Sequence, residues 1–299
     1  MDIDRTIGRC IYCGSTDDLS DEHIIPYGLG ATWVLRKASC KRHRDITSKF
    51  ELDVQRNLWG LIRAAIGTPS RKGHAGKLLK VMLKTEAGLE TDVDLDPALV
   101  GAPIEFIRLP LPRYLSGIKQ TGSLSVIGNV MHYFPDPERF RRELRAQYGP
   151  GQVSFSTTFQ PVAFAQMLAK IALGFTIARF GLEGIKKCYI IPAIDDGTGI
   201  GQWVGCIDDG ITLSEGTNDF EISGGFINTP TRDIVVEVRL FGKLKTPTYI
   251  VVVGEPKDNL KGEVTFQATI PAGSVDQLEI IRRSSESWVI PVPAPPAPE

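Results

Sequence analysis

Apolar residues recur every three or four positions after Cys40, the spacing that places side chains on one face of an α-helix. Polar and charged residues fill the intervening positions. Gly67, Thr68 and Pro69 follow, and this combination ends a helix. The pattern therefore predicts a long helix with one buried stripe, made of Ile46, Phe50, Val54, Leu58, Leu61, Ile62 and Ala65.

Residues 159–181 form the most apolar segment of the chain. Pro161 suits the first turn of a helix and Gly181 suits its end. Lys170 falls near the middle, where a bilayer would surround its charge with hydrocarbon. We therefore expect a helix that is buried on most faces inside the protein, and we expect no membrane partner.

The remaining segments alternate between strand and turn patterns. Residues 136–149 predict a short exposed helix, because Asp136 can cap it, Pro137 suits its first turn and Gly149 can end it. The glycine-rich residues 195–201 predict a hairpin turn. Segments rich in β-branched and aromatic residues predict strands over residues 77–84, 123–134, 186–194, 202–207, 224–229, 233–242 and 246–254.

These elements predict an α+β protein in three parts. Residues 1–70 are expected to form a small N-terminal domain, and residues 71–288 a larger mixed α+β domain whose role is recognition or regulation. Residues 289–299 contain too many prolines to pack and predict a disordered tail. Hydrophobic residues make up 42% of the 299 residues, which is enough to form a core in each domain.

The charge of the chain is unevenly distributed, although its net value is only −1. Residues 1–84 contain 15 Lys and Arg against 9 Asp and Glu, and the rest of the chain is acidic. A basic N-terminal part suggests contact with a polyanion such as a nucleic acid, and an ordinary solvated surface is the alternative. The first residues lack the pattern of a secretory signal, and five cysteines are an odd number for a disulfide framework. Both observations favour the cytoplasm.

Two pairs of candidate metal ligands flank 26 residues: Cys10 with Cys13, and Cys40 with His43. Two residues between ligands allow a tight turn to direct both side chains at one tetrahedral ion, and thiolates with a neutral imidazole suit Zn²⁺. A buried thiol pair with an incidental histidine is the alternative, but it leaves the repeated spacing unexplained. The pattern therefore predicts a structural zinc site.

An acid and a histidine, Glu22 and His23, lie between the two ligand pairs. Adjacent side chains on an extended segment point to opposite sides. Glu22 can therefore face a metal ion while His23 faces a water molecule, for which an imidazole is a suitable general base. The alternative is an ordinary histidine beside a solvated acid.

These motifs together resemble the HNH endonucleases. The order is Cys-x2-Cys, Glu-His-Ile-Ile-Pro, a glycine-rich turn, Ala-Ser-Cys-x2-His and Thr-Ser-Lys-Phe-Glu, and it extends over about residues 8–65. The resemblance is strongest to the bacterial branch whose ββα-metal fold is built on a zinc-binding treble clef. It implies a small ββα-metal domain in which His23 activates water and Glu22 ligates a catalytic Mg²⁺ or Mn²⁺.

The sequence departs from the HNH pattern after the second ligand pair. The family commonly has Asn or His where this chain has Arg44, and a Cys where it has His43. Asp45 or Glu51 is then expected to supply the second oxygen ligand. We assign His43 to zinc because the ligand spacing repeats; the alternative is that His43 binds the catalytic metal.

Basic residues cluster around the second ligand pair, where they are expected to contact phosphate without reading base sequence. For any one of them a solvated position is the alternative. The cluster comprises Arg36, Lys37, Lys41, Arg42, Arg44 and Lys49.

The sequence thus predicts a metal-dependent endonuclease that hydrolyses DNA, with RNA as the alternative substrate. A role in defence against foreign DNA, and an activating partner or ligand at the second domain, are hypotheses by analogy. One alternative is a catalytically weak, zinc-stabilised DNA-binding or regulatory protein. Another is a purely structural N-terminal domain, with the function in residues 80–285. The sequence does not predict an oligomeric state.

Overall fold

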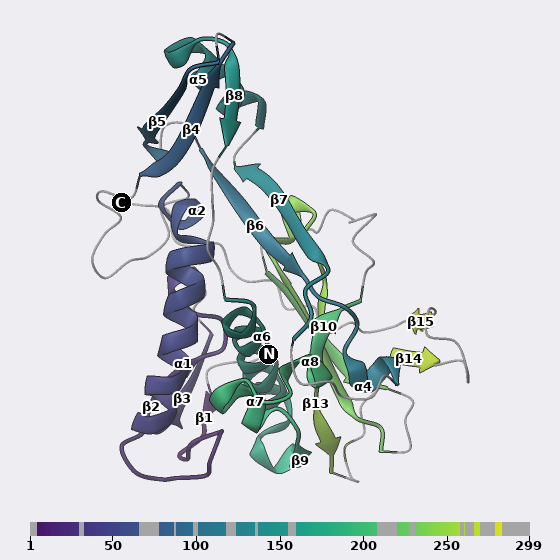
Figure 1. Ribbon diagram of the computed structural model, residues 1–299. Helices are drawn as coiled ribbons and strands as arrows, with labels where there is room; N and C mark the ends of the chain where they lie inside the picture. The colour runs from purple at the N-terminus through teal and green to yellow at the C-terminus, as the bar shows by residue number, and fades with distance from the viewer. Residues whose placement is uncertain are drawn as a thin grey trace.

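The fold, given by a computed structural model (Figure 1), confirms the predicted α+β class. A small N-terminal unit with clustered cysteine and histidine side chains precedes a larger unit built around a sheet. The residues described are 5–29, 33–65, 78–86, 88–97, 101–117, 124–134, 137–154, 160–207, 220–227, 231–257, 260, 266–269 and 279–282.

The N-terminal unit, residues 5–65, is called the head below. Its three strands form a sheet in the order β1-β3-β2, in which β1 is parallel and β2 antiparallel to β3. A short 3₁₀ helix, η1 (Tyr27–Leu29), follows β2. The strands are β1 (Arg5–Thr6), β2 (Ser20–His23) and β3 (Val34–Ser39).

The predicted long helix is confirmed, but it contains an irregular turn. It begins as α1 (Lys41–Asp53), continues as the π-helical segment η2 (Val54–Leu58) and ends in α2 (Gly60–Ala65). The Trp59 amide reaches back five residues to the Val54 carbonyl at 3.0 Å, as in a π-helix. The predicted stripe faces the core through Phe50, Val54, Leu58 and Ile62.

The larger unit is built on an antiparallel sheet in the order β10-β13-β12-β11, with β9 paired to another part of β13. These strands are rich in Val and Ile, which pack well on a pleated surface. Their bounds are β9 (Ile185–Cys188), β10 (Val204–Cys206), β11 (Phe220–Phe226), β12 (Ile234–Leu240) and β13 (Tyr249–Pro256).

The apolar helix α6 (Pro161–Phe180) lies between α1 and this sheet (Figure 1). Its side chains from Ala163 to Ala178 are all buried, which confirms the prediction of a helix covered on most faces. Within the described residues it is the one helix long and apolar enough to cross a membrane, but 89% of its most apolar window is buried inside the protein. Its burial is that of a core helix.

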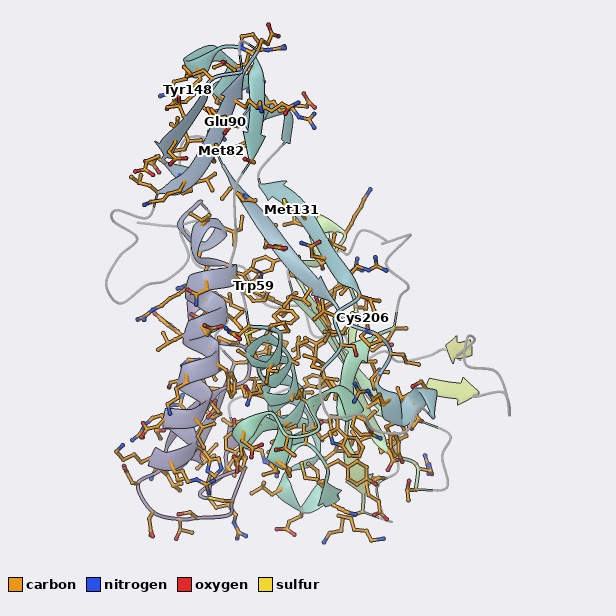
Figure 2. All side chains as sticks on the ribbon, in the orientation of Figure 1. Trp59, Met82, Glu90, Met131, Tyr148 and Cys206 are labelled. Atoms are coloured by element: carbon orange, nitrogen blue, oxygen red, sulfur yellow. The ribbon has the colours of Figure 1, made fainter. Side chains whose placement is uncertain are left out.

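One continuous apolar core joins the head to the larger unit. Trp59 points from the head into this core, where its ring contacts Phe106, Phe164 and Phe241, and its indole N–H donates to the Glu105 carbonyl at 3.0 Å (Figure 2). The boundary predicted at residue 70 therefore does not separate two apolar cores among the described residues.

A two-stranded ribbon leads from this core to a distal lobe at the top of Figure 1. The lobe has its own small apolar cluster under the predicted helix, which is confirmed as α5 (Pro137–Tyr148). The ribbon consists of β6 (Ala102–Arg108) and β7 (Gly128–Phe134), and the lobe sheet consists of β4 (Leu79–Thr85), β5 (Glu90–Leu95) and β8 (Gly151–Ser154).

The segment 186–201 differs from its prediction. The strand ends at Cys188, and α7 (Ile191–Asp196) follows because Pro192 cannot donate to a sheet but suits a first helical turn. The predicted hairpin turn instead joins α7 to α8 (Ile200–Trp203), with Gly197 and Gly199 in the left-handed conformation.

The remaining short elements are α4 (Arg113–Ser116), η3 (Leu182–Gly184), η4 (Gly242–Leu244), β14 (Phe266–Thr269) and β15 (Glu279–Arg282). The predicted tail, 289–299, lies outside the described residues.

Candidate functional site

The four predicted zinc ligands meet at one point of the head. The ligand atoms of Cys10, Cys13, Cys40 and His43 all lie within 4.8 Å of one another. The Cys13 and Cys40 sulfurs are 3.8 Å apart, and His43 Nδ1 lies 3.5 Å from the Cys10 sulfur and 3.3 Å from the Cys40 sulfur. A tetrahedron with zinc–ligand bonds of about 2.0–2.3 Å has edges of roughly 3.5–3.8 Å. The cluster could therefore hold a structural metal such as zinc.

Local backbone structure accounts for this convergence. Cys10 opens a tight turn in which the Gly14 amide donates to its carbonyl at 2.8 Å, while Gly14 takes a positive φ. Cys40 precedes α1, and His43 occupies the first turn of that helix. Burial raises the pKa of the Cys10 thiol to about 11. Burial opposes ionisation of Cys40 too, but hydrogen bonds with the His43 side chain and backbone outweigh it and lower its pKa to about 6.

The far side of His43 is held by a residue that the sequence did not identify. Asp195, on α7, accepts a hydrogen bond from His43 Nε2 at 3.0 Å. Arg42 reaches the other oxygen of the same carboxylate at 3.2 Å, and the Tyr12 ring stacks on His43 with centroids 5.0 Å apart. A carboxylate on the outer nitrogen fixes the orientation of a metal-binding imidazole. This geometry favours the zinc assignment of His43 over the catalytic one.

The carboxylates predicted to bind a catalytic metal separate into two groups. Glu22 and Glu51 meet around the ammonium of Lys170, with N–O distances of 2.9 Å and 2.7 Å. Asp45 is exposed and instead pairs with Lys41 at 2.6 Å, which holds its pKa below the usual range. The structure thus brings Glu22 and Glu51 together but places Asp45 elsewhere on the helix surface.

His23 is the last residue of β2, beside this charged cluster. Glu22 is buried while His23 is half-buried, as expected for neighbours on opposite faces of a strand. The His23 carbonyl accepts a hydrogen bond from Lys170, and its ring lies 5.5 Å from the ring of exposed Tyr27. His23 is therefore fixed at its backbone, with its side chain near the protein surface.

The predicted phosphate contacts lie on the head surface, and four of the six pair with acids. Arg36 pairs with Asp21 at 3.6 Å and Arg44 with Asp18 at 3.5 Å, in addition to the pairs of Lys41 and Arg42 described above. Lys37 and Lys49 are exposed. Exposed pairs of this kind are weak, so they leave the basic side chains available to a phosphate but reduce the local positive charge.

The larger unit contains a buried acid that the sequence also did not identify. Asp233 accepts hydrogen bonds from Tyr114 at 2.5 Å, Tyr189 at 2.9 Å and Thr231 at 2.9 Å. Burial and the adjacent carboxylate raise the pKa of Tyr114 to about 12. Because hydroxyl donors satisfy both of its oxygens, this acid ties α4 and the β9–α7 connection to the start of β12.

Comparisons with models of protein families, with curated proteins and with solved structures give no match.

Proposed function

We propose that the head is a zinc-stabilised HNH-type site that hydrolyses phosphodiester bonds in DNA. The order of its parts supports this proposal. A cysteine turn, a β-hairpin (β2 and β3) and a helix that starts between the second pair of ligands follow one another, as the resemblance implies. The exposed basic residues around that helix start would position the DNA backbone.

The observation that carries the proposal is the position of His23, half-buried at the end of β2 with the buried Glu22 beside it and Glu51 meeting Glu22 at Lys170. These carboxylates come from β2 and α1, and they converge only because the helix packs against the hairpin. His23 would remove a proton from the attacking water, and β3 fixes its strand through the His23–Val34 register. Arg44 or Lys41 would contact the phosphate.

The expected catalytic ion raises a conflict. Glu22 and Glu51 offer the hard oxygen ligands that Mg²⁺ and Mn²⁺ prefer. An ion bound there would stabilise the charge that develops on the phosphate. However, the Lys170 ammonium already lies between the two carboxylates, so the pair as it stands does not fit a divalent ion.

Plasmid cleavage with and without Mg²⁺ or Mn²⁺, on the full chain and on His23→Ala, tests the proposal. We expect nicking by the wild type and loss of at least a hundredfold in the variant, with the zinc content unchanged. His132→Ala, on β7 outside the head, is the matched control and should cleave like the wild type. Equal cleavage by wild type and His23→Ala would contradict the proposal.

A second candidate is a zinc-stabilised DNA-binding or regulatory protein without hydrolysis. The specific observation in its favour is Lys170, which neutralises charge where the resemblance expects a metal ion. This candidate predicts no cleavage under any metal condition and DNA affinity that is unchanged in His23→Ala. It also predicts weaker binding at higher salt, because phosphate contacts would supply the affinity.

A further inference from the structure

The environment of Lys170 is that of a bound cation. Its ammonium contacts Glu22 at 2.9 Å and Glu51 at 2.7 Å, and it donates to the carbonyl of His23. The Ile24 carbonyl lies at 3.5 Å. Two carboxylates and one close carbonyl therefore surround the ammonium group, which has three N–H donors. These contacts hold the Lys170 ammonium at the centre of the site.

The cluster is almost closed to solvent. The Lys170 side chain is 1% exposed, Glu22 is 7% exposed and Glu51 is 18% exposed. Burial alone would lower the pKa of Lys170, but the two carboxylates outweigh it and raise that pKa. The ammonium therefore stays charged, and one of the two negative charges is balanced inside the protein.

The packing of α6 delivers Lys170 to this position. Gly174 lies one turn after Lys170 on the same face of α6. A Cβ at Gly174 would lie 3.3 Å from Ile24 Cγ1 and 3.5 Å from Ile24 Cα, so the helix approaches the end of β2 closely there. One turn before Lys170, Gln166 donates to the Ile194 carbonyl of α7 at 2.9 Å. Contacts on both sides therefore fix the lysine.

We propose that Lys170 is the resident cation of the Glu22–Glu51 site and excludes a divalent metal ion from it. This proposal rests on the proposed function only because that function makes the two carboxylates candidate metal ligands. Which cation they bind can be tested separately. A divalent ion would have to displace a buried ammonium and leave it unpaired, a costly exchange. Lys170 is thereby a positioning residue that holds both carboxylates and the backbone of His23.

Titration of the full-length, zinc-loaded protein with Mn²⁺ alone tests this inference, with bound Mn²⁺ measured by electron paramagnetic resonance. We expect the wild type to bind no Mn²⁺ that depends on Glu22. In Lys170→Met, the two carboxylates should bind one Mn²⁺, with an affinity at least a hundredfold above the upper limit measured for the wild type. Adding Glu22→Gln to that variant should abolish the binding, and Lys84→Met, which removes an exposed lysine, should behave like the wild type.

The wild type and its Glu22→Gln variant keep the test decisive if Lys170→Met does not fold. Stoichiometric Mn²⁺ binding by the wild type that Glu22→Gln removes would overturn the inference. Plasmid cleavage on the same preparations separates the two proposals. Cleavage lost in His23→Ala, together with Mn²⁺ affinity independent of Lys170, would uphold the function and overturn the inference. Lys170-dependent exclusion of Mn²⁺ without cleavage would do the reverse.

Discussion

The head contains two clusters of potential ion ligands, and they are built on different principles. In the Cys10, Cys13, Cys40 and His43 cluster, four ligand atoms surround a point at separations that suit a tetrahedral metal. In the Glu22–Glu51 cluster, an ammonium from the protein itself occupies the corresponding place. The first cluster could hold a metal ion, whereas the second already contains a cation that the protein itself supplies.

This difference bears on stability and on chemistry. A metal bound by the first cluster would link the cysteine turn to α1, and through His43 and Asp195 to α7. Lys170 links β2 and α1 to α6 without any ion. Metals and chelators should therefore affect the first cluster and leave the second unchanged.

Removal of a zinc ligand should have the largest effect on this comparison. We expect Cys40→Ser to lose the bound zinc and to lower the melting temperature, because structural zinc contributes to folding, by about 10–16 kcal/mol in zinc-finger peptides. Elemental analysis and thermal unfolding measure both effects. The matched control is Cys188→Ala on β9, which should keep its zinc. One bound zinc and an unchanged melting temperature in Cys40→Ser would contradict the assignment.

Removal of the internal cation should come next. We expect Lys170→Met to lower the free energy of unfolding by about 3–5 kcal/mol at pH 7 without divalent ions, because it leaves two buried carboxylates uncompensated. Urea unfolding of zinc-loaded protein measures the change.

The control for Lys170→Met is Lys84→Met, which removes an exposed pair with Glu90 and should change the free energy of unfolding by less than about 1 kcal/mol. If Lys170→Met and Lys84→Met were equally stable, Lys170 would not be an integral part of the cluster. The two clusters would then differ less than their geometry indicates.

Loss of the outer contact of the zinc cluster should have a smaller effect. We expect Asp195→Asn to weaken zinc affinity about 10–100-fold, because the His43 imidazole loses the carboxylate that orients it. Competition with a chromogenic chelator measures the affinity. Asp196→Asn is a matched control, since the adjacent Asp196 bonds only Thr198 among the contacts described, so the substitution should not change zinc affinity.

The zinc cluster could be predicted from sequence because its information is local. Two residues between ligands, repeated in both pairs, indicate a turn geometry, and periodic apolar positions indicate the helix that carries His43. The partners of these residues could not be predicted in the same way. Lys170 lies 147 positions from His23, and Asp195 lies 152 positions from His43. No periodicity relates such positions, since only the packing of α6 and α7 against α1 brings them together.

Lys170 also illustrates how a correct structural prediction can miss a role. Its position in an apolar helix argued against a membrane span, and the helix is indeed a core helix. A charge at the centre of such a helix must be paired, and Glu22 and Glu51 were already candidates for a cation site. A pairing of Lys170 with Glu22 and Glu51 is consistent with both observations, but the sequence contains other acids that could equally pair with this lysine. The fold alone selects among them.

The smallest expected effect is the part of the pH dependence of stability that comes from Glu51 in the Glu22–Glu51 cluster. Burial raises the pKa of Glu51 above its usual 4.5, Glu22 adds to the rise, and Lys170 opposes it. The folded state then holds the proton more tightly than the unfolded state. Glu51 therefore contributes most to stability below pH 4.5, and this contribution is lost as the pH rises through its folded pKa. Glu51→Gln should therefore gain stability relative to the wild type as the pH rises through this window. The gain should be smaller than the loss expected for Lys170→Met.

Urea unfolding at several pH values measures the difference in the free energy of unfolding, with the exposed Glu90→Gln as control. Parallel curves for wild type and Glu51→Gln would mean that the ammonium balances both carboxylates, and that the cluster has no excess charge for a second cation to neutralise.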